Sequence, residues 1–190
     1  MRRFSFAALA LAMLLAGCAS QPTASAPAAA VDSNPNAKIA VASKLIDSGA
    51  PSIPDVGQAA PDFEFTMADG TAKKLSDLRG KKVIVNFWAT WCEPCREEMP
   101  DLDKVQQEYG DSLVILGVNK AESLEQISQF TTELPVSFAL VANPDGDISQ
   151  RYFTRTVPNS YFLNTDGTIG ARELKIMDYK TIKSALDSLH

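Results

Sequence analysis

The segment FWATWCEPCREEMP, residues 87–100, contains two of the three cysteines of the 190-residue chain and both of its tryptophans. Cys92 and Cys95 stand two residues apart, between an apolar run and the expected start of a helix. Metal ligation, a structural disulfide and a redox centre can each use a C-x-x-C spacing. The residues around the pair, and the rest of the chain, have to distinguish among these three kinds of site.

The residues on either side of the pair predict a strand followed by a helix. Residues 83–88 form a continuous run rich in β-forming side chains, typical of a central strand buried on both faces. After the cysteines, apolar residues recur on one face of a helix that should end at Gly110. Pro94 suits the first turn of that helix, where its missing N–H leaves no helical bond unmade. Cys92 is therefore expected at a helix N-terminus, where free N–H groups favour the thiolate.

The chain offers few further metal ligands. Structural zinc needs four ligands, mainly Cys and His, and the one histidine is His190. A copper site meets the same shortage of soft and imidazole ligands. A purely structural disulfide between Cys92 and Cys95 would close too small a loop to restrict the unfolded chain much. We therefore predict a redox-active dithiol–disulfide pair, with no metal and no other cofactor.

The two cysteines are expected to have different roles. Cys92 precedes the helix, so its sulfur can face solvent and a partner, and attack on a disulfide requires an accessible thiolate. Cys95 lies within the first turn, where the helix restricts access from outside. We predict that Cys92 is the nucleophile and that Cys95 resolves the mixed disulfide.

The N-terminus has the pattern of a secretory signal. Arg2 and Arg3 precede an apolar run at residues 4–15, which is too short for a permanent membrane span. The sequence LAGC then leads to Cys18 and resembles a bacterial lipobox, in which the cysteine is lipidated after cleavage. We expect a lipoprotein signal peptide at residues 1–17 and lipidation of Cys18; the alternative is an ordinary secretory signal with an incidental cysteine.

A tether is expected between this signal and the folded domain. Residues 19–36 are mostly Ala, Ser, Pro and Thr, a composition that cannot support a core. Residues 37–47 could form a short helix. We assign residues 18–56 to a lipid-anchored tether and residues 57–190 to the domain, which would work outside the cytoplasm, in the periplasm or extracytoplasmic space, next to a membrane.

The pattern from residue 57 onwards predicts one α/β domain. Strands at residues 63–67 and 71–75 should form an N-terminal hairpin. The elements expected after the cysteine helix are a strand at 113–119, a helix opened by Ser123, a strand at 137–141, a helix at 147–153, a hairpin of 161–164 and 168–174, and a helix capped by Asp178. Such alternation predicts a central mixed β-sheet flanked by helices. The net charge of −5 and the lack of a basic stripe argue against a nucleic acid partner.

Three stretches carry a resemblance to a known family. They are GQAAPDFEF (57–65), NFWATWCEPC (86–95) and TVPNSYFLNTDGTI (156–169). Residues 57–189 resemble the thioredoxin superfamily, and more closely its TlpA/ResA-like membrane-tethered thiol–disulfide oxidoreductases. The resemblance implies a thioredoxin-like fold with an N-terminal β-hairpin extension.

The resemblance also implies site residues outside the cysteine pair. Pro158 matches the cis-proline that lies against the disulfide in this family, although X-Pro bonds are usually trans. The Val157 backbone would then face the active site, where an extended substrate segment could pair with it. Trp91, Glu93 and Pro94 are expected to contact the substrate.

Two positions near the pair concern proton transfer. Thioredoxins carry a buried Asp six positions before the first cysteine; here that position is Asn86, which cannot titrate. Glu98 matches the acidic residue of TlpA/ResA-like proteins and, one turn from Cys95, could take the proton of that thiol. The alternative for any Glu in this segment is a solvated helix face, which we expect for Glu97. Trp88 is expected in the core.

The residues around the pair also bear on the direction of electron flow. Glu93-Pro94 offers no cation between the cysteines, and negative charge at Glu93 and Glu98 opposes the stabilised thiolate that a strong oxidant needs. This favours a reductant or a moderate-potential exchanger. The resemblance implies disulfide-containing protein substrates, as in cytochrome c maturation, and a membrane thiol–disulfide electron donor that re-reduces the pair.

Two other classes of function remain open. A peroxiredoxin-like thiol peroxidase shares the APDF opening, but it would place a lone peroxidatic cysteine in a T-x-x-C setting. A non-catalytic thioredoxin-fold binding lipoprotein would tolerate loss of either Cys92 or Cys95.

Overall fold

The computed structural model describes residues 38–47 and 53–190. The expected signal peptide, the lipidation of Cys18 and the first part of the tether lie outside the described residues. Among the residues that the structure describes, no helix is both long and apolar enough to cross a membrane.

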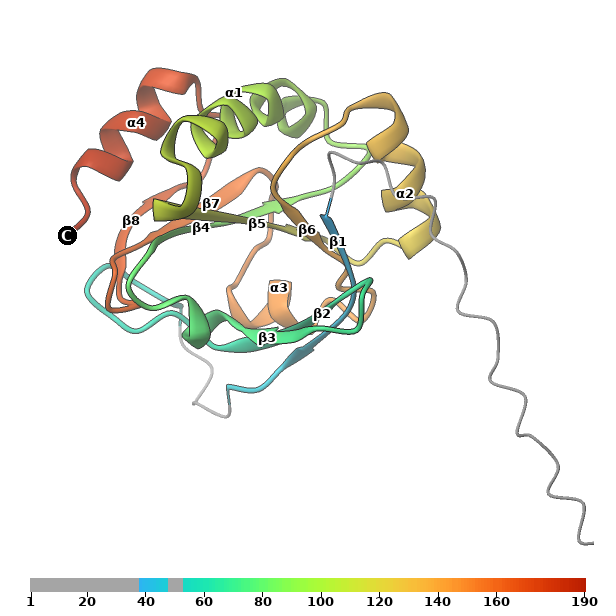
Figure 1. Ribbon diagram of the computed structural model, residues 1–190, viewed down its shortest axis with the longest axis horizontal. Helices are drawn as coiled ribbons and strands as arrows, with labels where there is room; N and C mark the ends of the chain where they lie inside the picture. The colour runs from blue at the N-terminus through green and yellow to red at the C-terminus, as the bar shows by residue number, and fades with distance from the viewer. Residues whose placement is uncertain (1–37, 48–52) are drawn as a thin grey trace, which may run out of the picture. The chain divides into compact units, whose positions relative to one another are not determined.

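Within these residues the chain forms one mixed sheet of eight strands in the order β3-β2-β1-β6-β5-β4-β7-β8 (Figure 1). The strands are β1 (Lys38–Leu45), β2 (Phe63–Met67), β3 (Ala72–Lys74), β4 (Lys82–Trp88), β5 (Leu113–Asn119), β6 (Ala139–Val141), β7 (Asn159–Leu163) and β8 (Ile169–Glu173). The helices are η1 (Leu75–Leu78), α1 (Glu93–Tyr109), η2 (Gly110–Ser112), α2 (Leu124–Glu133), α3 (Asp147–Arg151) and α4 (Tyr179–Asp187). The predicted central mixed sheet with flanking helices is confirmed.

The centre of the sheet carries the segment that leads to the cysteines. β4 pairs parallel with β5 and antiparallel with β7, and its residues after Lys82 are all buried. This confirms the prediction of a strand covered on both faces. The carboxyl end of β4 leads directly into residues 89–95, the active-site segment, which contains Cys92 and Cys95.

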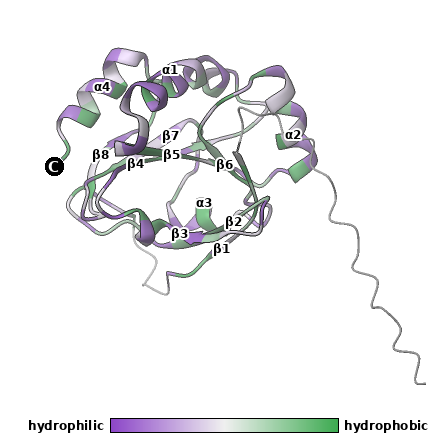
Figure 2. Cartoon of the chain, viewed as in Figure 1, coloured by the Kyte–Doolittle hydropathy of each residue, from purple (hydrophilic) through white to green (hydrophobic). Residues whose placement is uncertain are grey.

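Two cores cover the faces of this centre. On one face α1 and α4 pack over the sheet (Figure 1), through buried side chains that include Met99, Leu102 and Ile182. On the other face α3 contributes Ile148 to a cluster with Phe87. Both α1 and α4 carry hydrophobic residues among hydrophilic ones (Figure 2), as expected for helices with one face toward a core.

The predicted helix at residues 37–47 is wrong. Lys38–Leu45 form β1, which pairs antiparallel with β2 and parallel with β6. Ile39 and Ala40 are buried in the two cores. Pairing with the next strand, β2, and with the distant β6 outweighed the weak local preference. The folded sheet therefore begins before residue 57, and residues 38–45 belong to it rather than to a tether.

Several local signals are confirmed. β2 and β3 form the N-terminal antiparallel hairpin, and β7 and β8 form the second one. Ser123 and Gln126 form the capping box of α2, and the Asp178 side chain caps α4. Gly110 ends α1 with a φ of 53°, a left-handed value that glycine adopts at little cost.

Candidate functional site

Cys92 and Cys95 lie where β4 gives way to α1. Cys92 is the N-cap of α1, and its Sγ accepts a hydrogen bond of 3.2 Å from the backbone N–H of Cys95. The two sulfurs are joined in a disulfide, with the Cα atoms 5.3 Å apart. The predicted position at a helix N-terminus is confirmed, and the structure represents the oxidised form of the pair.

The surface next to the disulfide is formed by the residues around Cys92. Cys92 is 4% exposed and Cys95 1% exposed, so both are largely covered in the disulfide form, and their separate roles stay a prediction. Trp91, directly before Cys92, is 67% exposed, and Glu93 and Pro94 are exposed as well. A partner that approaches the disulfide would therefore meet Trp91, Glu93 and Pro94.

Trp88 has the predicted core position. It is fully buried, and its indole Nε1 donates a 3.0 Å hydrogen bond to the Gly117 carbonyl of β5. Its ring packs at 4.6 Å, centroid to centroid, against that of Phe130 in α2. These contacts fix the end of β4 from which the active-site segment leaves.

Pro158 lies at the same end of the sheet as the disulfide. Asn159, the next residue, pairs with Phe87 near the end of β4. The Val157–Pro158 peptide bond is cis, as the sequence resemblance implied. Pro158 is buried, and the half-buried Val157 packs against the core cluster that contains both cysteines.

Glu98 is buried one helical turn beyond Cys95. Only 1% of it is exposed, whereas Glu97 is exposed as expected. One carboxylate oxygen, Oε1, accepts a 2.7 Å hydrogen bond from Asn86 Nδ2. The other, Oε2, accepts one of 3.1 Å from the backbone N–H of Met177, which precedes α4. Glu98 is therefore not on a solvated face, while its role in proton transfer stays a prediction.

The surroundings of Glu98 change its acidity. Burial raises the pKa of this carboxyl from 4.5 to about 7, because the charged form loses its hydration. The hydrogen bonds from Asn86 and Met177 act in the opposite direction. A group that titrates near neutral pH is suited to accept and return a proton there.

A second buried carboxyl, Glu122, had no role in the sequence analysis. It is 7% exposed and accepts hydrogen bonds from Thr90 N–H at 2.7 Å, from the Thr90 hydroxyl, and from Asn119 Nδ2 at 2.8 Å. These bonds attach the residues before Cys92 to the end of β5. Glu122 follows a predicted strand, but nothing in the sequence pattern pairs it with Thr90.

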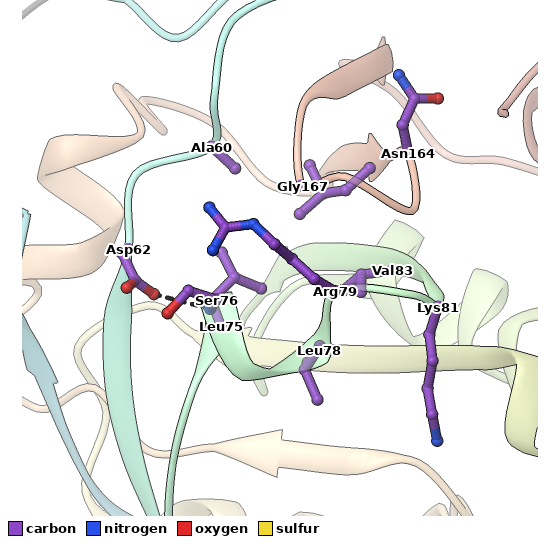
Figure 3. Close-up of a pocket in the computed structure, with 11 residues that line it drawn as sticks. Ala60, Asp62, Leu75, Ser76, Leu78, Arg79, Lys81, Val83, Asn164 and Gly167 are labelled. Atoms are coloured by element: carbon purple, nitrogen blue, oxygen red, sulfur yellow. Dashed lines mark hydrogen bonds between the residues drawn. The ribbon is translucent and has the colours of Figure 1, made fainter.

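A small cavity of about 50 Å³ lies at the other end of the sheet, where Val83 begins the buried part of β4 (Figure 3). The Arg79 side chain extends along it and donates to the Asp166 carbonyl at 3.0 Å. Asp62 accepts a 3.0 Å hydrogen bond from the Ser76 N–H. These polar groups are engaged by neighbouring backbone. Among the described residues no cluster of three His, Cys, Asp or Glu could hold a metal ion.

Comparisons with known proteins agree with this geometry. The model of the AhpC/TSA family matches residues 56–172. The thioredoxin-like protein YneN of Bacillus subtilis is 39% identical over 134 residues, which are 69% of this chain and 78% of YneN. The thiol–disulfide oxidoreductase ResA of Geobacillus thermodenitrificans is 31% identical over 135 residues, 70% of this chain and 78% of ResA.

Solved structures give the same result. A putative thiol:disulfide interchange protein DsbE from Chlorobium tepidum is 27% identical with a TM-score of 0.64, over 70% of this chain and 99% of that one. The exposed lipoprotein thioredoxin Etrx1 of Streptococcus pneumoniae is 30% identical with a TM-score of 0.60, over 67% and 99% of the two chains.

Proposed function

We propose that this protein reduces disulfides of protein substrates outside the cytoplasm. The chain belongs to the AhpC/TSA family and is a thiol–disulfide oxidoreductase of the ResA and DsbE type, with a thioredoxin-like fold. The observation that carries the proposal is the buried Glu98 carboxyl one turn behind Cys95, in a site whose other cysteine lies beside the exposed Trp91.

Reduction of a substrate would proceed in two exchange steps. The Cys92 thiolate attacks one sulfur of the substrate disulfide; a Cys92–substrate disulfide forms, and the other substrate sulfur leaves as a thiolate. Cys95, as a thiolate, then attacks the Cys92 sulfur, which forms the Cys92–Cys95 disulfide and releases the second substrate thiolate. Two electrons pass to the substrate, and the oxidised protein is the form described above.

Glu98 would serve the second step. Cys95 has to lose its proton before it can attack, and it is 1% exposed, so bulk water has little access to it. A carboxylate one turn along the same helix provides an internal acceptor. With its pKa at about 7, Glu98 is ionised in about half of the molecules at neutral pH and can take this proton.

The charges at the pair support reduction, rather than oxidation, of the substrate. The N-terminus of α1 favours the Cys92 thiolate, but Glu93 in the first turn and Glu98 behind it are acidic. With no cation between the two cysteines, the thiolate lacks one source of the stabilisation that a strong oxidant needs. A reductant therefore suits the site, with apocytochrome c disulfides as one substrate class and a membrane thiol–disulfide carrier as the electron donor.

Membrane anchoring belongs to the same proposal. The LAGC sequence before residue 19 supports lipidation of Cys18, and the similar Etrx1 is described as an exposed lipoprotein. Substitution Cys18→Ala in the full chain should release the protein from membranes or leave it held by an uncleaved signal. Unchanged membrane partitioning after demonstrated removal of the signal would reject the anchor.

The decisive experiment is substrate trapping in cells that express the full chain with Cys95→Ser. Mixed disulfides between Cys92 and envelope proteins should accumulate and identify the substrates by mass spectrometry. The matched control Cys92→Ser should trap almost nothing. Hydrogen peroxide consumption without a disulfide substrate would favour a peroxidase instead, and full complementation by Cys92→Ser would favour a non-catalytic binding protein.

A further inference from the structure

The Asn86 side chain connects helix α1 to strand β7. It lies in the middle of β4 with no exposed surface, and antiparallel pairing sets it opposite Ser160 of β7. Its Nδ2 donates to Glu98 Oε1 at 2.7 Å and to Ser160 Oγ at 2.9 Å. Both N–H groups of the amide are thereby used, one on each neighbour.

The carbonyl oxygen of the same amide is left without a hydrogen bond in this arrangement. In the part of the chain that the structure describes, the buried Asn86 Oδ1 has no hydrogen-bond partner. An unpaired buried acceptor is unfavourable. The reverse orientation of the amide would place Oδ1 against the Glu98 carboxylate, where lone pairs repel. The two donor contacts therefore determine the orientation, and they match a charged Glu98.

We propose that Asn86 is a positioning residue for thiol–disulfide exchange: held by Ser160, its amide keeps the Glu98 carboxylate in place behind Cys95 and favours the charged form that accepts the thiol proton. The proposal rests on the proposed proton-accepting role of Glu98. Because an amide does not titrate, the proton taken from Cys95 stays on Glu98 and is not shared with β4.

Among the described groups around Glu98, Asn86 is the side chain that donates a hydrogen bond to its carboxylate. On α1 the nearest titratable groups are Cys95 one turn before and Asp101 one turn after, and Asp101 accepts from the Tyr179 N–H. The segment before α4 presents the Met177 N–H, with Lys175 and Asp178 exposed beside it. On β4 the neutral Asn86 contacts the carboxyl, and the neutral Ser160 of β7 contacts Asn86 in turn. The side-chain donor to Glu98 is Asn86, and its loss should weaken the charged form, in line with the pKa effect of that bond.

The first measurement is the titration of Glu98 in the oxidised full chain. The side chains of glutamate are labelled with ¹³C, and the Glu98 signal is identified by its loss in Glu98→Gln. The parent midpoint should lie near pH 7. Asn86→Leu removes the donor at similar volume and should raise the midpoint by about one pH unit or more, since a hydrogen bond to a charged group favours that charge.

Two further variants test the same contact while they keep a polar group in the core. Asn86→Asp should give two coupled titration steps, because two neighbouring carboxyls share a proton. Ser160→Ala leaves the Asn86 donor in place but frees its second N–H, so the midpoint should rise by less than in Asn86→Leu. Circular dichroism shows whether each variant is folded.

The matched control is Asn119→Leu. Asn119 is also a fully buried asparagine, and it donates to the other buried carboxyl, Glu122. Its loss should leave the Glu98 midpoint unchanged. A Glu98 midpoint that responds equally to Asn119→Leu and Asn86→Leu would indicate general loosening and overturn the proposal.

The second measurement is the rate of Cys95 alkylation by iodoacetamide in Cys92→Ser chains between pH 5 and 10. Asn86→Leu should move the pH profile, and adding it to Glu98→Gln should have little further effect. If Asn86→Leu folds and its Glu98 midpoint is unchanged, the proposal is overturned. If Asn86→Leu does not fold, an unchanged Glu98 midpoint in both Asn86→Asp and Ser160→Ala overturns it. An unchanged profile in Glu98→Gln overturns it as well, by removing the role of Glu98. Failure of the oxidoreductase proposal is distinct: the parent would then exchange no disulfide.

Discussion

Two buried carboxyl groups flank the active-site segment, and their surroundings differ. Glu122 holds the residues just before Cys92: it accepts two hydrogen bonds from Thr90 and one from Asn119. Glu98 lies behind Cys95 and accepts one bond from Asn86 and one from the Met177 N–H. Burial is nearly complete at both, with 7% and 1% exposed.

The two carboxyls therefore differ in what their hydrogen bonds hold together and, under our proposal, in function. At Glu122 the three donors connect the chain before Cys92 to β5, so the carboxyl holds a loop in place. At Glu98 desolvation outweighs the two donors and raises the pKa to about 7. Similar burial thus occurs in two different hydrogen-bond environments, one with three donors and one with two.

The largest effects should come from the cysteines between the two carboxyls. Cys92→Ser should abolish exchange and trap no substrate, because the attacking sulfur is lost. Cys95→Ser should keep the first step and accumulate mixed disulfides through Cys92. Non-reducing gels and mass spectrometry of the trapped species measure both outcomes. Substrates found on Cys95, or faster alkylation of Cys95 than of Cys92 in the reduced protein, would reverse the assignment.

Glu98→Gln should give the next largest effect, on rate. Without the internal acceptor, exchange near pH 7 should slow by about 100-fold, the lower range for loss of a general base. The steep part of the pH–rate profile around neutral pH should flatten while the circular dichroism spectrum stays unchanged. Exchange of reduced protein with glutathione disulfide, followed between pH 5 and 9, provides the test. Equal rates for parent and variant throughout would remove Glu98 from the mechanism.

The same substitution should change how stability depends on pH. The folded-state pKa of Glu98, about 7, lies above its ordinary value of 4.5, so the folded protein binds the proton more tightly than the unfolded chain. This contribution is present in full below pH 4.5 and is lost as the pH rises through 7, by roughly 3 kcal/mol in all. Urea unfolding of the oxidised proteins at pH 5 and pH 8 should show this loss in the parent and not in Glu98→Gln.

Glu122→Gln should have the smallest effect and a different character. An amide NH₂ in place of one acceptor oxygen leaves a donor of Thr90 or Asn119 unpaired, which should lower the free energy of unfolding by about 1–3 kcal/mol. The pH–rate profile should keep its shape, because the carboxyl behind Cys95 is untouched. A shift of that profile comparable to the one in Glu98→Gln would show that the two carboxyls do not differ in role.

The sequence by itself determined much of the fold. Continuous apolar runs marked β4 and β5, and Ser123, Asp178 and Gly110 marked helix ends, because these signals depend on neighbours within a few residues. The C-x-x-C spacing after a buried strand, together with the shortage of further metal ligands and the small loop that a structural disulfide would close, predicted the redox pair at the start of α1. β1 was not predicted. Its backbone hydrogen bonds are made with β2 and β6, and pairing with other segments leaves little trace in the pattern of a short segment of mixed polar and apolar residues.

The tertiary structure decided the burial, and with it the acidity, of Glu98. Glu97 and Glu98 are the same residue type side by side, and local pattern assigns neither of them to the core. The packing of α1 over β4 and the segment before α4 leaves Glu97 exposed and Glu98 covered. Asn86 and Met177 reach Glu98 from 12 and 79 residues away in the chain. Acidity follows desolvation, and desolvation depends on which distant segments exclude water from a side chain.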